Sequence, residues 1–226
     1  MVTYTVPGMK NDSAERVIKL LQDRLNSLSD LALTLKHIHW NVTGPNFIAV
    51  HTMLDPQVDG VRVMVDDVAE RIATLGGSPV GTPGALVAQR DWDDYSIGRS
   101  GTQQHLGALD VVYTGIIEAH RRAIDATEEL DPVTQDMLIA QAGELEQYHW
   151  FVRAHLEAPD GSLTTGNAST EKTAAQRAKT PRAKKALRRD RGSRPAPFGL
   201  KNLRAERGRA FASAHRSSGR GAGPRG

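Results

Sequence analysis

The sequence predicts an all-α protein, in which four long helices form a bundle and a basic tail follows. Apolar residues recur every three or four positions in four separate segments before residue 158, as they do on the buried face of a helix. After residue 161 this periodicity disappears, and Ala, Lys, Arg, Ser, Gly and Pro dominate. No stretch approaches 18 uninterrupted apolar residues, so we expect no membrane-spanning helix.

The first two helices are expected to form an antiparallel pair joined by a short turn. The first should begin near Asp12, whose carboxylate would cap the helix with Glu15 at the reciprocal position. The Thr-Gly-Pro sequence at 43–45 should end it, because proline disfavours helical geometry in the residue before it. The second helix should run from about Asn46 to Leu75, where a Gly-Gly-Ser-Pro sequence follows.

A long connection separates this pair from a second pair. Residues 76–99 are rich in Gly, Pro and Asp, with room for a short helix near 84–89. A third helix is expected over about 102–130, and a fourth from Asp131-Pro132 to about Glu157, with the aspartate as cap and the proline in the first turn. Short, long and short connections predict two antiparallel pairs joined by a crossover.

Charge divides the chain more sharply than its net value of +3 suggests. Residues 1–160 contain 12 basic against 23 acidic side chains, a net −11, whereas residues 161–226 contain 17 against 3, a net +14. We therefore expect a flexible segment over 1–10, a bundle over 11–160 and a tail over 161–226. With so little to bury, the tail should be disordered in isolation.

One stripe of the second helix carries candidate metal ligands. At 100° per residue, His51, Asp55, Asp66 and Glu70 fall at about 0°, 40°, 60° and 100° around the axis. His39, near the end of the first helix, can reach the same side. Imidazole and carboxylate without sulfur suit Fe(II), Mn or Zn. The alternative is a solvated acidic face beside a hydrogen-bonded histidine at an interface.

The spacing along this helix also concerns assembly. His51 and Asp66 are 15 residues apart, which is roughly 22 Å along the axis, so they cannot share a metal within one chain. A second, antiparallel copy of the helix would bring the histidines of one chain to the carboxylates of the other. Pro56 should kink the helix and re-aim Asp55, because proline removes a backbone donor.

A competing metal site is possible inside the bundle. Glu146-x-x-His149 matches the Glu-x-x-His element of di-iron sites that lie within one bundle. Such sites need two of these elements, and the chain has no second copy. There is no cysteine either, which excludes thiolate sites and disulfides.

Several motifs together resemble the Dps family, the DNA-binding proteins from starved cells. The motifs are His39-Trp40-Asn41, Gly44-x-Asn46-Phe47, His51-x-x-x-Asp55, Asp66-x-x-x-Glu70 and Trp150-Phe151. The resemblance covers about residues 11–157, and the long basic tail is of the actinobacterial type. It implies a ferritin-like four-helix bundle, because members of this family are mini-ferritins.

The resemblance also implies a ferroxidase centre at a two-fold interface. His39 and His51 would come from one subunit and Asp66 and Glu70 from its neighbour, while Asp55 would complete the site or hold a ligand. Iron would be the only cofactor, oxidised from Fe(II) by hydrogen peroxide or dioxygen and stored as ferric mineral in a hollow homododecamer. Trp40 would either intercept oxidising radicals or pack in the core, and core packing is the simpler interpretation.

Ferrous iron should enter such a shell through acidic pores, drawn by focused negative potential. The candidate pore residues are Asp131, Asp136 and Glu144, at the start of the fourth helix. The alternative, which fits Asp131 best, is an acid that complements the helix macrodipole.

The tail is expected to bind double-stranded DNA without sequence preference, through its phosphates. The candidate DNA-binding residues are Lys172, Arg177, Lys179, Arg182, Lys184, Lys185, Arg188, Arg189, Arg191 and Arg194. A solubilising tail is the simpler alternative, and a membrane surface is disfavoured because the tail lacks an apolar face. The expected location is the cytoplasm, in association with the nucleoid.

Two other functions remain open at this point. One is a non-enzymatic DNA-compacting protein with a vestigial or structural metal site. The other is an iron store of the ferritin type, with its site inside the bundle.

Overall fold

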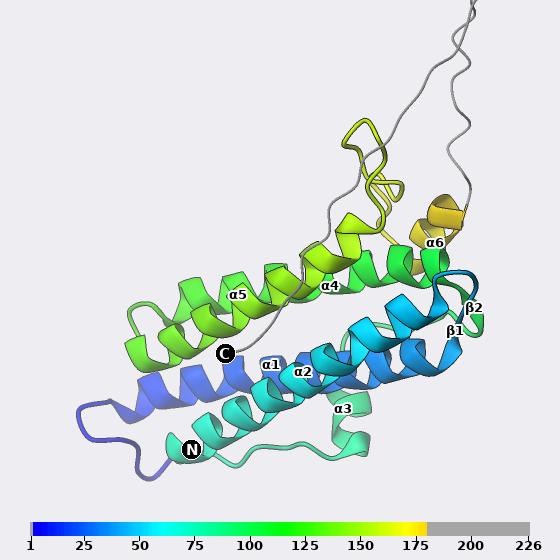
Figure 1. Cartoon of the computed structure of the whole chain (residues 1–226). Helices are drawn as coiled ribbons and strands as arrows, with labels where there is room; N and C mark the ends of the chain where they lie inside the picture. The colour runs from blue at the N-terminus through cyan, green and yellow to red at the C-terminus, as the bar shows by residue number, and fades with distance from the viewer. Residues whose placement is uncertain (1, 180–226) are drawn as a thin grey trace, which may run out of the picture. The chain divides into compact units, whose positions relative to one another are not determined.

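The computed structural model describes residues 2–179, and these form an all-α unit (Figure 1). Its helices are α1 (Asn11–Asn41), α2 (Phe47–Thr74), α3 (Pro83–Gln89), α4 (Thr102–Thr127), α5 (Pro132–Ala154) and α6 (Glu171–Lys179). The four long helices and the short helix of the crossover are therefore confirmed to within a few residues at each end. None of the helices in the described part of the chain is long and apolar enough to cross a bilayer.

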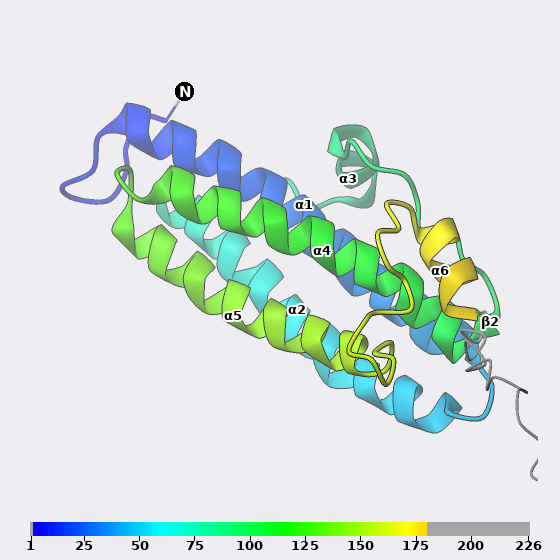
Figure 2. The ribbon, with the colours of Figure 1, turned by 90° about the horizontal axis from the view of Figure 1, so that it is seen from above.

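The helices pack as the connection lengths predict. α1 packs along α2 and α4 along α5, and the two pairs lie against each other (Figures 1 and 2). The crossover carries α3 beside α1 and ends in β2 (Ser100–Gly101), which pairs in parallel with β1 (Val42–Thr43). This small sheet fixes the turn between α1 and α2 to the start of α4.

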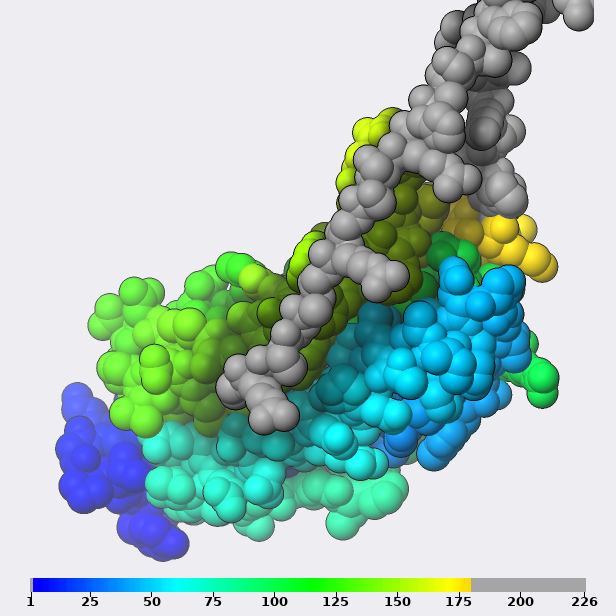
Figure 3. Space-filling model, in the orientation of Figure 1, coloured from blue at the N-terminus to red at the C-terminus, as the bar shows by residue number. Residues whose placement is uncertain are grey.

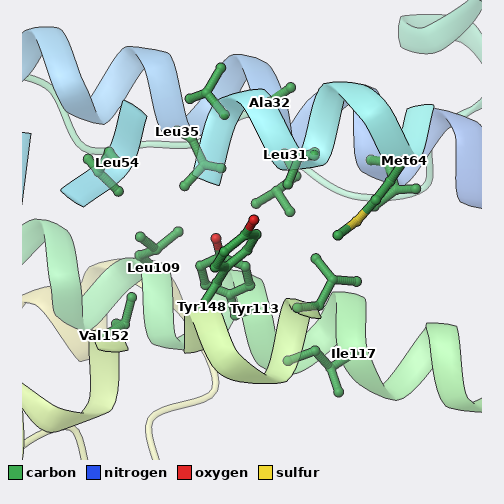
Figure 4. Close-up of a cluster of buried hydrophobic side chains, with 14 of the residues drawn as sticks. Leu31, Ala32, Leu35, Leu54, Met64, Leu109, Tyr113, Ile117, Tyr148 and Val152 are labelled. Carbon is green, nitrogen blue, oxygen red and sulfur yellow. The ribbon is translucent and has the colours of Figure 1, made fainter. Parts of the chain in front are cut away.

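The core lies between the two helix pairs. Leu31 and Leu35 of α1 face Leu109 of α4 across it, and two tyrosines occupy its centre (Figure 4). Tyr113 is fully buried, and its hydroxyl donates a 2.8 Å hydrogen bond to Oε1 of Gln57. The middle of the bundle is therefore filled with packed side chains.

The N-terminus differs from expectation. Lys10, rather than Asp12, occupies the cap position of α1, and no side chain caps the helix. Oε1 of Glu15 instead accepts a 2.6 Å hydrogen bond from the amide of Val2. At the end of α2, Gly76 has a φ of 86° and lies so close to Tyr4 that an added Cβ would come 2.1 Å from the Tyr4 carbonyl oxygen. The segment predicted to be flexible thus packs against α2 from residue 2 onward.

The C-terminal boundary also differs. The tail was expected to begin at residue 161, yet α6 packs against α4. Ala174, Ala175 and Ala178 are buried there, and a Cβ on Gly107 would come 2.8 Å from the Ala174 carbonyl oxygen. Small residues on both helices allow this close approach, so the folded unit extends to Lys179. The prediction of a disordered tail over 180–226 lies outside the described residues.

Candidate metal centre

His39 and His51 hold each other in place where α1 and α2 meet. Nδ1 of His39 donates a 2.9 Å hydrogen bond to the carbonyl oxygen of His51, and Nδ1 of His51 donates one of 2.9 Å to the carbonyl oxygen of His39. The two rings stack with centroids 3.6 Å apart. Because a carbonyl oxygen can only accept, each Nδ1 carries a proton, and this selects the tautomer whose lone pair lies on Nε2.

This arrangement fits metal binding. Metal-ligating histidines normally donate their second ring N–H to a carbonyl or carboxylate, which fixes the tautomer and the ring orientation. Here both rings do so, and no contact among the described residues engages either Nε2. The pair is therefore preorganised to offer two imidazole nitrogens to a cation.

Asp55 stands beside the pair but already has a partner. Its Oδ1 lies 2.7 Å from Nζ of Lys36 and 3.3 Å from Nδ1 of His39. The hydrogen bond from Lys36 is the main cause that lowers the pKa of Asp55, and His39 adds to it. α2 runs without a break through Pro56. Asp55 is thus an anion that bridges Lys36 and His39.

Asp66 and Glu70 do not reach the histidines within the subunit. Both are exposed on α2, much of which is uncovered at the molecular surface (Figure 3). Among residues 2–179, no group of three or more His, Asp or Glu side chains is placed to hold a metal within one chain. A centre shared between two subunits requires that Asp66 and Glu70 lie away from the histidines of their own chain.

Exposed apolar side chains surround these residues. Trp40 is 71% exposed, Ile48 64% and Val63 60%. The interpretation of Trp40 as a core residue is therefore wrong for the single subunit, because nothing within residues 2–179 covers most of this side chain. Apolar groups of this kind mark surfaces that a partner covers.

The intra-bundle alternative is excluded by the partners of its two residues. Glu146 accepts a 2.8 Å hydrogen bond from Nε of Arg121, on the outside of α4. His149 points to Asp110, with its Nε2 2.7 Å from Oδ1. The two side chains are committed to different ion pairs, so the Glu-x-x-His match carries no metal site.

Asp110 is the buried charge that the sequence analysis missed. Its carboxylate accepts hydrogen bonds from His149 (2.7 Å), Nε of Arg153 (2.8 Å) and Oγ1 of Thr165 (2.9 Å). Burial alone would raise the pKa of Asp110, but these hydrogen bonds outweigh it and lower the pKa to about 2. A lone aspartate within the apolar run Leu109 to Val112 is the signal that could have identified it. The network joins α4, α5 and the segment before α6.

The three pore candidates have different surroundings. Asp131 is the N-cap of α5 and only 7% exposed, with Oδ2 2.6 Å from Nη2 of Arg71. Its carboxylate is thus used within the subunit, which supports the structural alternative. Asp136 is exposed, and Glu144 is exposed while accepting a hydrogen bond from the hydroxyl of Tyr148.

The DNA-binding candidates fall into two groups. Lys172, Arg177 and Lys179 lie on the exposed side of α6, and Nη1 of Arg177 donates a 3.0 Å hydrogen bond to the Thr165 carbonyl oxygen. The others lie outside the described residues: Arg182, Lys184, Lys185, Arg188, Arg189, Arg191 and Arg194.

Comparison with known proteins places the chain in a family. The ferritin-like domain family matches residues 18–160. The "DNA protection during starvation protein" of Mycolicibacterium smegmatis is 58% identical over 179 residues, which cover 79% of this chain and 98% of the relative. The "fine tangled pili major subunit" of Haemophilus ducreyi is 48% identical, with 71% and 85% covered.

Solved structures agree with this placement. Mycobacterium smegmatis Dps in its tetragonal form has a TM-score of 0.72 and 59% identity, with 73% of this chain and 99% of that chain covered. DpsA14 from Streptomyces coelicolor has a TM-score of 0.72 and 62% identity, with 73% and 98% covered. The chain therefore belongs to the Dps family of ferritin-like proteins.

Proposed function

We propose that the protein oxidises Fe(II) at a centre shared by two subunits and stores the ferric product inside an oligomeric shell. The observation that carries this proposal is the reciprocal pairing of His39 and His51, because it selects the tautomer in which Nε2 of each ring can bind a metal.

The carboxylates would come from a second copy. Asp66 and Glu70 lie on the same stripe of α2 as His51 but roughly 22 Å along the axis. An antiparallel α2 from a neighbour would place its Asp66 and Glu70 at the histidines, and two-fold symmetry would generate two such sites. The exposed Ile48 and Val63 of α2 supply apolar surface for this contact. We propose a homododecamer as the complete shell, with Asp136 and Glu144 as residues of the iron-entry pores.

The chemistry follows from the ligand types. Neutral imidazoles and carboxylates bind Fe(II) and, through the negative charge of the carboxylates, favour Fe(III). Two ferrous ions give one electron each to hydrogen peroxide, which takes up two protons and leaves as two waters. This paired transfer avoids hydroxyl radical; dioxygen is the alternative oxidant.

Two substitutions test the site. His51→Ala removes one imidazole, and Glu70→Gln removes one charge at the other end of α2. Each should slow peroxide-driven Fe(II) oxidation strongly while the oligomer persists. His155→Ala, at the exposed C-cap of α5, and Glu129→Gln are matched controls that should leave the rate unchanged. Normal oxidation rates in both site variants would contradict the assignment.

Mixing the two inactive variants tests the sharing of the site. In a pair formed by one His51→Ala and one Glu70→Gln subunit, one site carries both lesions and the other carries none. Random assembly should therefore restore about a quarter of the wild-type activity, because half of the pairs are mixed and each has one intact site. A site within one chain would give no recovery.

We also propose that the basic residues of 161–226 hold duplex DNA in the cytoplasm, in association with the nucleoid. The support is their charge, 17 basic against 3 acidic side chains. Repeated on each subunit, such a tail binds by avidity. A chain that ends after Lys179 keeps α6 packed on α4 and should lose most DNA retardation, while the intact protein should show a steep salt dependence. Unchanged retardation by the shortened chain would refute the role of the tail.

The Fe(II)-oxidation and DNA-retardation assays also distinguish this proposal from the alternative function. A DNA-compacting protein without iron turnover would retard DNA normally and show no difference between the wild type and His51→Ala in Fe(II) oxidation.

A further inference from the structure

A groove of about 970 Å³ runs between α1 and α4 and is separate from the histidine pair of the candidate metal centre. Residues 91–96 of the crossover and residues 169–172 at the start of α6 border it. Figure 2 looks onto this side of the molecule, where α1 and α4 lie side by side. Neither His39 nor His51 lines the groove.

Two arginines, one from α1 and one from α4, lie among the residues of the groove. Arg24 and Arg122 both line it, and Nη1 of Arg24 is buried with no hydrogen-bond partner in the described part of the chain. Burial lowers the pKa of Arg24, the charge of Arg122 lowers it further, and Asp23 and Asp91 oppose this through space. A buried donor without an acceptor is unfavourable, more so when it carries charge. Asp23 and Asp91 act on Arg24 only through space, and neither hydrogen-bonds its Nη1, so an anion within reach of that atom would stabilise it.

We propose that Arg24 and Arg122 form a binding site for a small phosphate ion. A guanidinium donates through two parallel N–H groups, and a tetrahedral oxyanion has enough oxygens to accept from two guanidinium groups at once. Phosphate would satisfy Nη1 of Arg24 and offset the repulsion between the two cations.

The rest of the groove favours a small anion over DNA. Asp91 and Asp93 line the wall formed by the crossover, as does Asp94, which pairs with Arg90. Carboxylates at this wall would repel an extended polyanion such as duplex DNA. A single phosphate carries far less charge than duplex DNA and can be held by Arg24 and Arg122 together, so the carboxylates repel it less.

Gly115 of α4 leaves room for the ligand. It lines the groove, and a Cβ at this position would meet no atom within 4 Å. A large side chain here would fill the groove without a clash and without changing its charge. Gly143 of α5 is a matched position, since its Cβ would also meet nothing within 4 Å and it does not line the groove.

The test is calorimetric titration of the assembled full-length protein with inorganic phosphate at fixed ionic strength. Arg24→Gln and Gly115→Leu should each weaken binding at least tenfold. The controls Arg16→Gln, an exposed arginine on the same helix, and Gly143→Leu should stay within twofold of the wild type. Absence of saturable binding by the wild type, or equal binding by all variants, would overturn the proposal.

DNA retardation by the same variants identifies the source of the phosphoryl group. Free phosphate as the ligand predicts equal retardation by the wild type, Arg24→Gln and Gly115→Leu. If both groove variants instead lose DNA binding while phosphate affinity is unchanged, the arginines contact DNA and the proposal of a small-ion site is wrong.

Discussion

Two regions of the molecule hold histidines by hydrogen bonds, yet they use different ring nitrogens and different partners. At the junction of α1 and α2, His39 and His51 donate Nδ1–H to backbone carbonyl oxygens. Between α4 and α5, His149 donates Nε2–H to the carboxylate of Asp110, which also binds Arg153 and Thr165.

The hydrogen-bond acceptor of each histidine determines which ring nitrogen remains available to a metal. A backbone carbonyl orients the ring, adds no charge and leaves the lone pair on Nε2 available. In the Asp110 network a buried carboxylate of α4 accepts the Nε2–H of His149, and its three donors come from α5 and from the segment before α6. The second region fastens the C-terminal segment to the bundle, whereas the first has the ring orientation that our proposal of a cation site requires.

Removal of the Asp110 carboxylate should have the largest effect on stability. Asp110→Ala leaves the buried His149 and Thr165 without their acceptor, and each buried donor left unsatisfied in this way costs roughly 1–3 kcal/mol. The melting temperature should fall by roughly 10 °C when measured at fixed subunit concentration.

His51→Ala should have the opposite balance, a small effect on stability and a large effect on iron oxidation. His51 is half-buried, so its removal should lower the free energy of unfolding by only about 1 kcal/mol while abolishing rapid iron oxidation. If Asp110→Ala melts like the wild type, or if His51→Ala melts lower than Asp110→Ala, the division between a fastening and a binding region is wrong.

Acid should affect the interior histidines before it affects Asp110. Burial lowers the pKa of His120 from 6.5 to about 4, with a smaller contribution from the charge of Arg24, and burial lowers that of His105 to about 4. As the pH falls, these histidines take up a proton at a higher pH in the unfolded chain than in the folded one. The free energy of unfolding should therefore decline between pH 6.5 and pH 4, by up to about 3 kcal/mol for each histidine.

Asp110 contributes to the pH dependence of stability at a lower pH than the histidines do. Its pKa falls from 3.8 to about 2 on folding, so its contribution is complete above pH 4 and is lost as the pH falls toward 2. Melting temperatures measured from pH 7 to pH 3 should show the first decline in the wild type and a shallower one in His120→Gln. An unchanged slope in this variant would contradict the pKa assignment.

The sequence was sufficient to predict the bundle. Helical periodicity and the turn at 43–45 fixed the ends of α1 and α2, and connection lengths fixed the crossover. The packing of α6 was missed because an alanine-rich, basic segment gives no strong apolar stripe. Its contact depends on Gly107 of α4, a distant residue that has no side chain to signal it.

The metal centre was predicted as a set of residues but not as a geometry. Spacing placed His51 and Asp66 on one stripe, yet the mutual hydrogen bonds of His39 and His51 depend on how two helices approach each other. The same limit explains the Glu146–His149 match, since only packing revealed that Arg121 and Asp110 engage these side chains.

The smallest predicted effect concerns Lys36, the one cation that contacts the Asp55 carboxylate among the described residues. Its ammonium group competes with a metal for Asp55 and repels a cation at the neighbouring histidines. Exposed ion pairs of this kind are weak, so Lys36→Met should tighten Fe(II) binding only a few-fold in an anaerobic titration. Lys19→Met, an exposed lysine on the same helix, should leave the affinity unchanged.

The opposite result for Lys36→Met would also be informative about the binding region. Weaker Fe(II) binding would mean that Lys36 holds Asp55 in the position from which its carboxylate orients His39, 3.3 Å away. The region would then resemble the Asp110 network more closely than its open surface suggests, since a chain of side chains, and not the backbone carbonyls alone, would set the orientation of the ring.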